Sequence, residues 1–205
     1  MLKRLTLFVI IIILAINPAK SLEHSLTQEQ INLINEISQY NSDIKTMVGK
    51  FLQIDSSGAR TEGMFYLDRP NKIRFRYAPP SREEIISVGR GFYVIDRREE
   101  TKFAYPQDQI PLRIFLNEQI NLLDANITEV TASEDYIAIT IVDETQIGPV
   151  KVALIFEIET KDLVQWVLTE PSGAQLTFSL YDVQKNLIIP KSYFYIPAQY
   201  GAKKL

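Results

Sequence analysis

Apolar and polar residues alternate over most of the second half of the chain, most regularly at 152–158, 164–168 and 176–180. Because successive side chains of a β-strand point to opposite faces, this period of two predicts strands with one apolar face. Strand-like runs also fill the first half, between short joints containing Gly, Pro or Asp, at 47–53, 61–69, 72–77, 84–88, 92–96 and 100–105. Roughly eleven such strands favour a single curved sheet or open barrel over two separate domains.

Two segments have the spacing of helices instead. Thr27 and Gln30 have the spacing of a helix capping box. Isoleucines follow at helical spacing, at Ile31, Ile34 and Ile37. This pattern predicts an amphipathic helix over 27–40. A second apolar stripe within 110–123 predicts a helix inserted between hairpins, with Leu112, Phe115, Leu116, Ile120 and Leu123 on one side.

The inserted helix has two interpretations. It could fill the barrel as ordinary core, or it could be a movable cover over the apolar concave face, in which case a pocket lies beneath it. Shared parity within the strands predicts the residues of that face: Phe65, Leu67, Ile73, Phe75, Val152, Leu154, Phe156, Val164, Trp166, Leu168, Leu176 and Phe178. The cover would consist of Ile31, Ile34, Leu112, Phe115, Leu116 and Ile120.

The N-terminus has the features of an export signal. Lys3 and Arg4 precede an apolar run over 5–16, and small residues at 19–21 suit a signal peptidase. The run is shorter than the roughly 18 residues of a membrane anchor, which is the alternative interpretation. We therefore expect cleavage of 1–21 and a single domain over 22–205. No cysteine follows the run, so the chain is not expected to be a lipoprotein itself.

Charge and composition exclude several classes of function. Without 1–21 the chain keeps 19 basic and 25 acidic residues, a net charge of −6. This balance argues against nucleic-acid binding and against electrostatic docking to anionic lipid, because both need clustered Lys and Arg. The absence of cysteine excludes disulfides and thiolate chemistry. We expect a monomer whose stability comes from its core.

Enzymatic interpretations find little support. The single histidine, His24, lies beside the expected new N-terminus, so neither a Ser-His pair nor a multi-histidine metal site is expected. The paired carboxylates at 83–84 and 99–100 lie at turns among arginines, which is typical of solvated hairpin ends. Glycine-rich phosphate loops are missing as well. We expect a non-enzymatic protein without metal or cofactor.

One charged residue breaks the apolar pattern. Counting in twos, Phe65, Leu67 and Arg69 share a face, so an arginine ends an apolar row. A cation at that place must be paired with an anion or take part in gating.

The motifs at 48–53, 62–77, 79–80 and 85–96 resemble those of the periplasmic outer-membrane lipoprotein carrier family, LolA. They contain F-x-Q, G-x-F-x-L-x-R-P, R-F-x-Y and a glycine-bounded hairpin, in that order. The resemblance spans nearly the whole mature chain and is strongest between Gly49 and Asp96. It weakens afterwards, where mostly the order of elements agrees.

The resemblance implies a mainly β fold with helices, an unclosed antiparallel β-barrel of roughly eleven strands under an α-helical lid. It also implies a periplasmic chaperone whose cargo is acylated lipoproteins. Its partners would be an inner-membrane ABC transporter that releases lipoproteins and an outer-membrane acceptor, or the outer membrane directly. The family's gating arginine falls on Arg69, where it would bond to backbone carbonyls of the lid.

The C-terminal stretch departs from the family. It has Pro197-Ala198 where Pro-Pro is frequent and stops soon after, at Leu205, so contact with donor and acceptor is left open. Sensor domains that bind lipid or lipoprotein share the fold, and a sensor is the alternative function.

Overall fold

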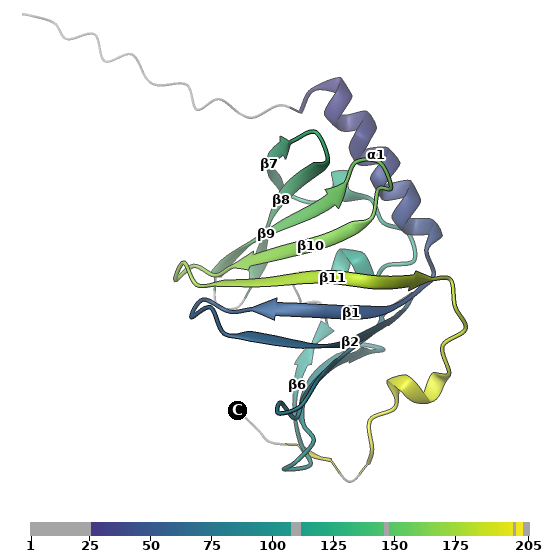
Figure 1. The fold of residues 1–205 in the computed structure, drawn as a ribbon, viewed down its shortest axis with the longest axis vertical. Coiled ribbons are helices and arrows are strands. Elements are labelled where there is room, and N and C mark those ends of the chain that lie inside the picture. The colour runs from purple at the N-terminus through teal and green to yellow at the C-terminus, as the bar shows by residue number, and fades with distance from the viewer. Residues whose placement is uncertain (1–25, 108–111, 146–147, 199, 203–205) are drawn as a thin grey trace, which may run out of the picture.

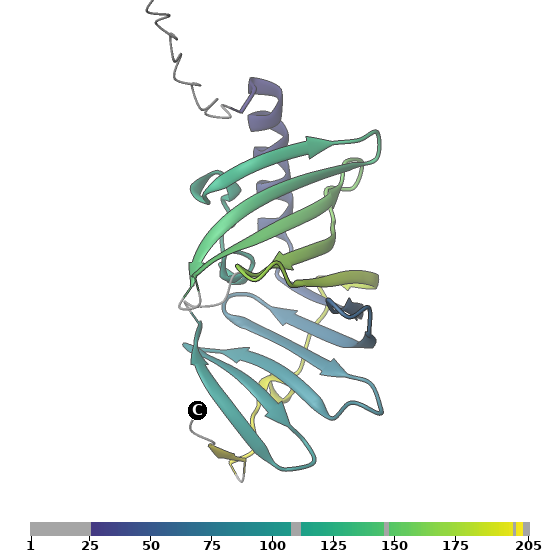
Figure 2. The same cartoon turned by 90° about the vertical axis from the view of Figure 1, so that its left-hand side faces the viewer.

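The computed structural model describes residues 26–107, 112–145, 148–198 and 200–202, and shows one long, strongly curved sheet with a helix across one half of it (Figures 1 and 2). The expected signal peptide and His24 lie outside the described residues. None of the helices in the described part of the chain is long and apolar enough to span a bilayer.

Eleven strands form the antiparallel sheet. They are β1 (Thr46–Ile54), β2 (Arg60–Asp68), β3 (Lys72–Tyr77), β4 (Glu83–Val88), β5 (Gly91–Asp96), β6 (Thr101–Pro106), β7 (Ile127–Ala132), β8 (Tyr136–Thr145), β9 (Gly148–Glu157), β10 (Leu163–Thr169) and β11 (Gln175–Lys185). A twelfth, β12 (Gly201–Ala202), pairs in parallel with β6.

The order of the strands leaves the barrel open. Strand β1 lies in the middle, between β2 and β11, with Met47 opposite both Leu67 and Lys185. From there the sheet runs through β2–β6 on one side and β11–β7 on the other. Within the described ranges no ladder joins β7 to β6 or β12, so the sheet does not close on itself. The expected unclosed barrel is confirmed.

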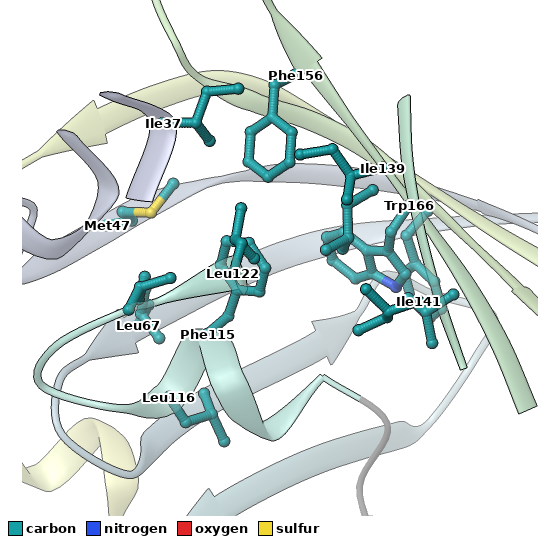
Figure 3. Close-up of a cluster of buried hydrophobic side chains, with 14 of the residues drawn as sticks. Ile37, Met47, Leu67, Phe115, Leu116, Leu122, Ile139, Ile141, Phe156 and Trp166 are labelled. Atoms are coloured by element: carbon teal, nitrogen blue, oxygen red, sulfur yellow. The ribbon is translucent and has the colours of Figure 1, made fainter. Parts of the chain in front are cut away.

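The N-terminal helix is also confirmed. Helix α1 (Gln28–Asp43) begins after Thr27, whose hydroxyl accepts from the Gln30 backbone N–H while the Gln30 side chain accepts from the Thr27 N–H. Ile34 and Ile37 are fully buried. Figure 3 shows Ile37 next to Phe156 of β9, so the apolar side of α1 covers the β8–β10 half of the sheet.

The predicted helix at 110–123 is wrong for the described residues from Leu112 onward. They form two short 3-10 turns, η2 (Arg113–Leu116) and η3 (Leu122–Asp124), and Asn117 and Asn121 have extended backbones. Hydrogen bonds to other parts of the chain replace those of a helix. The backbone N–H of Ile120 donates to the Ser42 hydroxyl (2.8 Å) and that of Leu122 to the Ser38 hydroxyl (3.1 Å). We call 112–124 the cover segment.

Polar contacts fix α1 to the sheet. The Asn41 side chain donates to the Lys161 carbonyl (2.9 Å), and the Tyr40 hydroxyl donates to Asp162 (2.8 Å), which also pairs with Lys185 of β11. These contacts join the last turn of the helix to the β9–β10 turn and to β11. The cover segment, by contrast, has little regular structure of its own.

Replacing Ile37 by alanine should lower the free energy of unfolding by about 2–5 kcal/mol, because it leaves a cavity in the closely packed half of the molecule. Urea denaturation followed by circular dichroism measures this loss. The half-buried Ile31, changed in the same way, is the matched control and should cost clearly less. Equal losses would contradict the packing of α1 described above.

Candidate functional site

An apolar cavity of about 250 Å³ lies between the cover segment and the concave face of the sheet. Sixteen of its eighteen lining residues are apolar; the lining consists of Asn41, Met47, Phe65, Leu67, Arg69, Ile73, Phe75, Ile85, Phe92, Leu112, Phe115, Leu116, Leu163, Trp166, Leu168, Leu176, Phe178 and Leu180. Strands β1–β5, β10 and β11 contribute to the lining, together with Asn41 in the last turn of α1. Strands β8 and β9, which α1 covers, do not.

The structure places eight of the twelve residues expected on the concave face in this lining: Phe65, Leu67, Ile73, Phe75, Trp166, Leu168, Leu176 and Phe178. Val152, Leu154 and Phe156 point to the same interior but are fully buried in the core. Phe156 contacts Phe115 of the cover segment, with ring centroids 6.0 Å apart. The concave face is therefore part cavity and part core.

Val164 is displaced by an irregularity in its strand. The pairing of β10 with β9 shifts between Leu163 and Gln165, so strict alternation fails there, and Leu163 lines the cavity instead of Val164. Of the expected cover residues, Leu112, Phe115 and Leu116 line the cavity. Ile34 and Ile120 lie in the core, and Ile31 is half-buried on α1.

Sequence reasoning missed five further apolar lining residues: Met47, Ile85, Phe92, Leu163 and Leu180. Parity could have found Leu180, which continues the row of Leu176 and Phe178, and Ile85, which lies opposite Phe75 in the register of β3 and β4. No pattern in the sequence distinguishes Phe92 from a surface strand residue.

Arg69 is buried at the edge of the cavity, with 6% of its surface exposed. Its Nε donates to the Phe115 carbonyl (2.8 Å) and its Nη1 donates to the Ile44 carbonyl, so one guanidinium joins the cover segment to the residue that ends α1. Burial lowers the pKa of Arg69 to about 10, which leaves it charged at neutral pH. In the described residues no carboxylate forms an ion pair with it, and both acceptors are backbone oxygens.

Two more contacts hold the cover segment over the cavity. The Asn71 backbone N–H donates to the Leu116 carbonyl (2.8 Å) beside the Arg69 contact. On the other side, Arg113 forms a two-pronged ion pair with Asp143 of β8, with Nη2 2.9 Å from Oδ1. Polar bonds thus hold the edges of the segment, in addition to the buried side chains of Phe115 and Leu116.

Trp166 forms one wall of the cavity. Its ring stacks on Phe178 (centroids 4.9 Å apart) and meets Phe75 edge-on (6.0 Å). Its Nε1 is buried and has no hydrogen-bond partner in the structure. Figure 3 shows the indole among aliphatic side chains that include Ile139 and Ile141. A wall of this composition suits hydrocarbon and offers almost nothing to a polar substrate.

The described residues contain no group of three or more His, Asp or Glu side chains that could hold a metal ion. Neither carboxylate pair of the sequence, 83–84 or 99–100, lines the cavity. The expectation that both pairs are solvated is wrong for Glu84, which is buried between Arg74, Arg76 and Arg97 and forms ion pairs with them. The lining, which is apolar except for Asn41 and Arg69, suits an apolar ligand.

A family model described as "Outer membrane lipoprotein carrier protein LolA" matches residues 42–197. The chain belongs to the LolA family. Proteins named outer-membrane lipoprotein carrier protein are similar to it in Alkalilimnicola ehrlichii (34% identity over 34% of this chain) and in Halorhodospira halophila (27% over 66%). The matched segments span 35% and 64% of those two relatives.

Solved structures share the fold of this LolA-family chain at low identity. A putative outer membrane lipoprotein-sorting protein domain from Vibrio parahaemolyticus aligns with a TM-score of 0.51 and 7% identity, over 80% of this chain and 95% of that one. A Thermus thermophilus protein aligns with a TM-score of 0.50 and 8% identity, over 84% and 97%. These matches show the same fold, and the family that the chain belongs to is a family of lipoprotein carriers. An apolar cavity agrees with that family.

Filling of the cavity should be visible in the emission of Trp166, the only tryptophan in the chain. Because the indole lines the cavity, an apolar ligand that enters changes its surroundings, and a titration with a long-chain fatty acid should shift or quench the emission to saturation. A Trp166→Phe variant should keep binding, measured by equilibrium dialysis, and lose the signal. Saturable binding that leaves the wild-type emission unchanged would place the ligand elsewhere.

Proposed function

We propose that the protein is a periplasmic carrier that holds the acyl chains of lipoproteins in the cavity and transfers them from the inner to the outer membrane. The observation that carries this proposal is an apolar cavity covered by a segment that one buried, charged arginine joins to the end of α1, through the carbonyls of Phe115 and Ile44. An inner-membrane ABC transporter would load it, and cargo would pass to an acceptor or to the outer membrane directly.

The energetics of an acyl chain explain why the cavity is apolar. Each methylene exposed to water costs roughly 0.8 kcal/mol, so a carrier needs a large apolar surface to keep a lipid anchor in solution. The closed cavity of about 250 Å³ is smaller than the roughly 300–1,000 Å³ of ordinary small-molecule sites. Loading therefore requires the cover segment to move.

Arg69 supplies the opposing force. Hydrogen bonds from a charged group are worth roughly 1.5–3 kcal/mol each, so its two bonds favour the closed state and count against binding. That penalty keeps the affinity for cargo low enough for release. The carrier itself needs no nucleotide, because the energy for loading would come from the transporter.

A first experiment tests the ligand class. An anilino-naphthalene dye should fluoresce on binding to the cavity and be displaced by a triacylated lipopeptide, whereas the same peptide without acyl chains should not displace it. The deacylated peptide is the matched control. Equal displacement by both would indicate a peptide-binding module. Absence of dye binding would contradict the proposal that the cavity binds acyl chains.

A second experiment tests the gate. The Arg69→Leu variant keeps the bulk of the side chain and loses both carbonyl bonds, so the open state is favoured and bound lipoprotein is retained. Uptake from inner membranes should persist, while transfer to acceptor membranes should fall roughly tenfold or more. Radiolabelled lipoprotein followed between membrane and soluble fractions measures both steps.

The control for this variant is Arg60→Leu. Arg60 is an exposed arginine at the start of β2, the strand that Arg69 follows, and this variant should transfer cargo normally. Removing one partner of a buried ion pair would cost about 3–5 kcal/mol of stability. Since the acceptors of Arg69 are carbonyls, we expect a smaller loss. A well-folded Arg69→Leu protein that delivers at the normal rate would rule out the gate and leave the carrier assignment intact.

A further inference from the structure

The chain that follows β11 forms a strap over the outer face of the sheet. This strap, 186–198, leaves β11 near the end of α1 and contains η4 (Lys191–Phe194) (Figure 1). Phe194 is buried against the outside of β3 and β4. Arg74 fixes it further, donating from Nη1 to the Tyr193 carbonyl (2.6 Å) while Nη2 binds the buried Glu84. These contacts fix the strap to the sheet.

The strap exposes large apolar side chains that nothing in the fold requires to be exposed. Of the six exposed large hydrophobic residues in the described ranges, four belong to it: Leu187 (42%), Ile188 (99%), Tyr193 (39%) and Tyr195 (63%). Solvent-exposed apolar side chains gathered on one segment indicate a contact surface. Ile188 is the extreme case, since its whole side chain faces solvent.

The local charge of this segment differs from that of the rest of the protein. Asp182 is the last acidic residue of the chain, and Lys185 and Lys191 follow it in the described part. Lys185 is neutralised by Asp162, whereas Lys191 is exposed beside the apolar residues. The negative net charge predicts no general attraction of the domain to anionic lipid. The strap itself carries one lysine and no acidic residue, next to exposed aliphatic and tyrosine side chains. Aliphatic side chains, tyrosines and a lysine together are typical of segments that lie at a membrane interface.

The strap is also attached beside the gate. The Asn186 backbone N–H donates to the Thr46 carbonyl, the Lys45 N–H donates to the Asn186 side chain (both 2.9 Å), and the Thr46 hydroxyl donates to the Leu187 carbonyl (2.6 Å). The backbone N–H of Arg69 donates to the Lys45 carbonyl (2.9 Å), and its guanidinium binds the Ile44 carbonyl. Residues 44–46 therefore bind the two residues that precede Ile188 in the strap, and they also bind the gating arginine.

We infer that the strap docks on the surface of an anionic bilayer, with Leu187 and Ile188 in the outer part of the hydrocarbon, the tyrosines at headgroup level and Lys191 on lipid phosphates. The contact is small, so docking is weak and reversible. It brings the end of the barrel that carries Arg69 to the membrane with which cargo is exchanged. This use of the surface rests on the proposed carrier function, but docking itself requires no cargo.

The test uses the full mature chain without cargo and two kinds of large vesicle, phosphatidylethanolamine with phosphatidylglycerol, and phosphatidylcholine alone. Wild-type protein should float with the anionic vesicles, less with the neutral ones, and less again at high salt. Ile188→Asp should reduce partitioning to anionic vesicles roughly tenfold or more, since burying one isoleucine accounts for about that factor. Thermal unfolding should be unchanged, because the side chain packs against nothing.

Tyr136→Asp is the control, because Tyr136 is another exposed large hydrophobic residue (46%), at the start of β8 and outside the strap. It should bind vesicles like the wild type. Failure of the wild type to bind anionic vesicles, equal binding by Ile188→Asp, or equal loss in Tyr136→Asp would each overturn the inference. If dye displacement by acylated peptide succeeds while vesicle binding fails, the carrier function stands and the exposed surface serves a protein partner instead.

Discussion

A curved sheet with one continuous apolar face must be covered, and how this chain covers that face decides the rest of the structure. Helix α1 packs on β8–β10, where Ile37, Phe156 and their neighbours are fully buried. Strands β2–β5 and β11 lie under a short, irregular segment instead, whose apolar side chains leave a cavity of about 250 Å³ below them. The same alternating pattern therefore gives a packed core under α1 and a cavity under the cover segment. The two regions differ in the segment that covers the sheet.

The cover segment is attached both by buried apolar side chains, among them Phe115, Leu116 and Leu122, and by polar contacts around them. Arg69, Asn71 and Arg113 hold its edges, and Ser38 and Ser42 of α1 hold its far end. Directional bonds of this kind break one by one, whereas a packed core yields only as a whole. Helix α1 has its own polar contacts to the sheet, through Tyr40, Asn41 and Asp162, which do not involve the cover segment.

Much of this could be predicted from sequence, for physical reasons. Alternation reports the two faces of a strand directly, so it gave the sheet, eight of the cavity residues and the apolar row that Arg69 ends. It failed at Val164, because a shift in pairing between two strands leaves no trace in either strand alone. The second helix was wrong because its backbone N–H groups bond to serines about 80 positions earlier, and helical spacing cannot reveal such distant competitors.

The central position of β1 in the sheet constrains the order in which the chain can fold. Its ladder with β11 joins residue 47 to residue 185, so the first strand made cannot complete its pairing until nearly the whole chain is available. Contacts this distant in sequence slow folding, since a long loop must close before they form. The walls contributed by β10 and β11 are the last to be synthesised, so the apolar cavity comes into existence only at the end of assembly. A chain whose last strands are still missing has no enclosed apolar space.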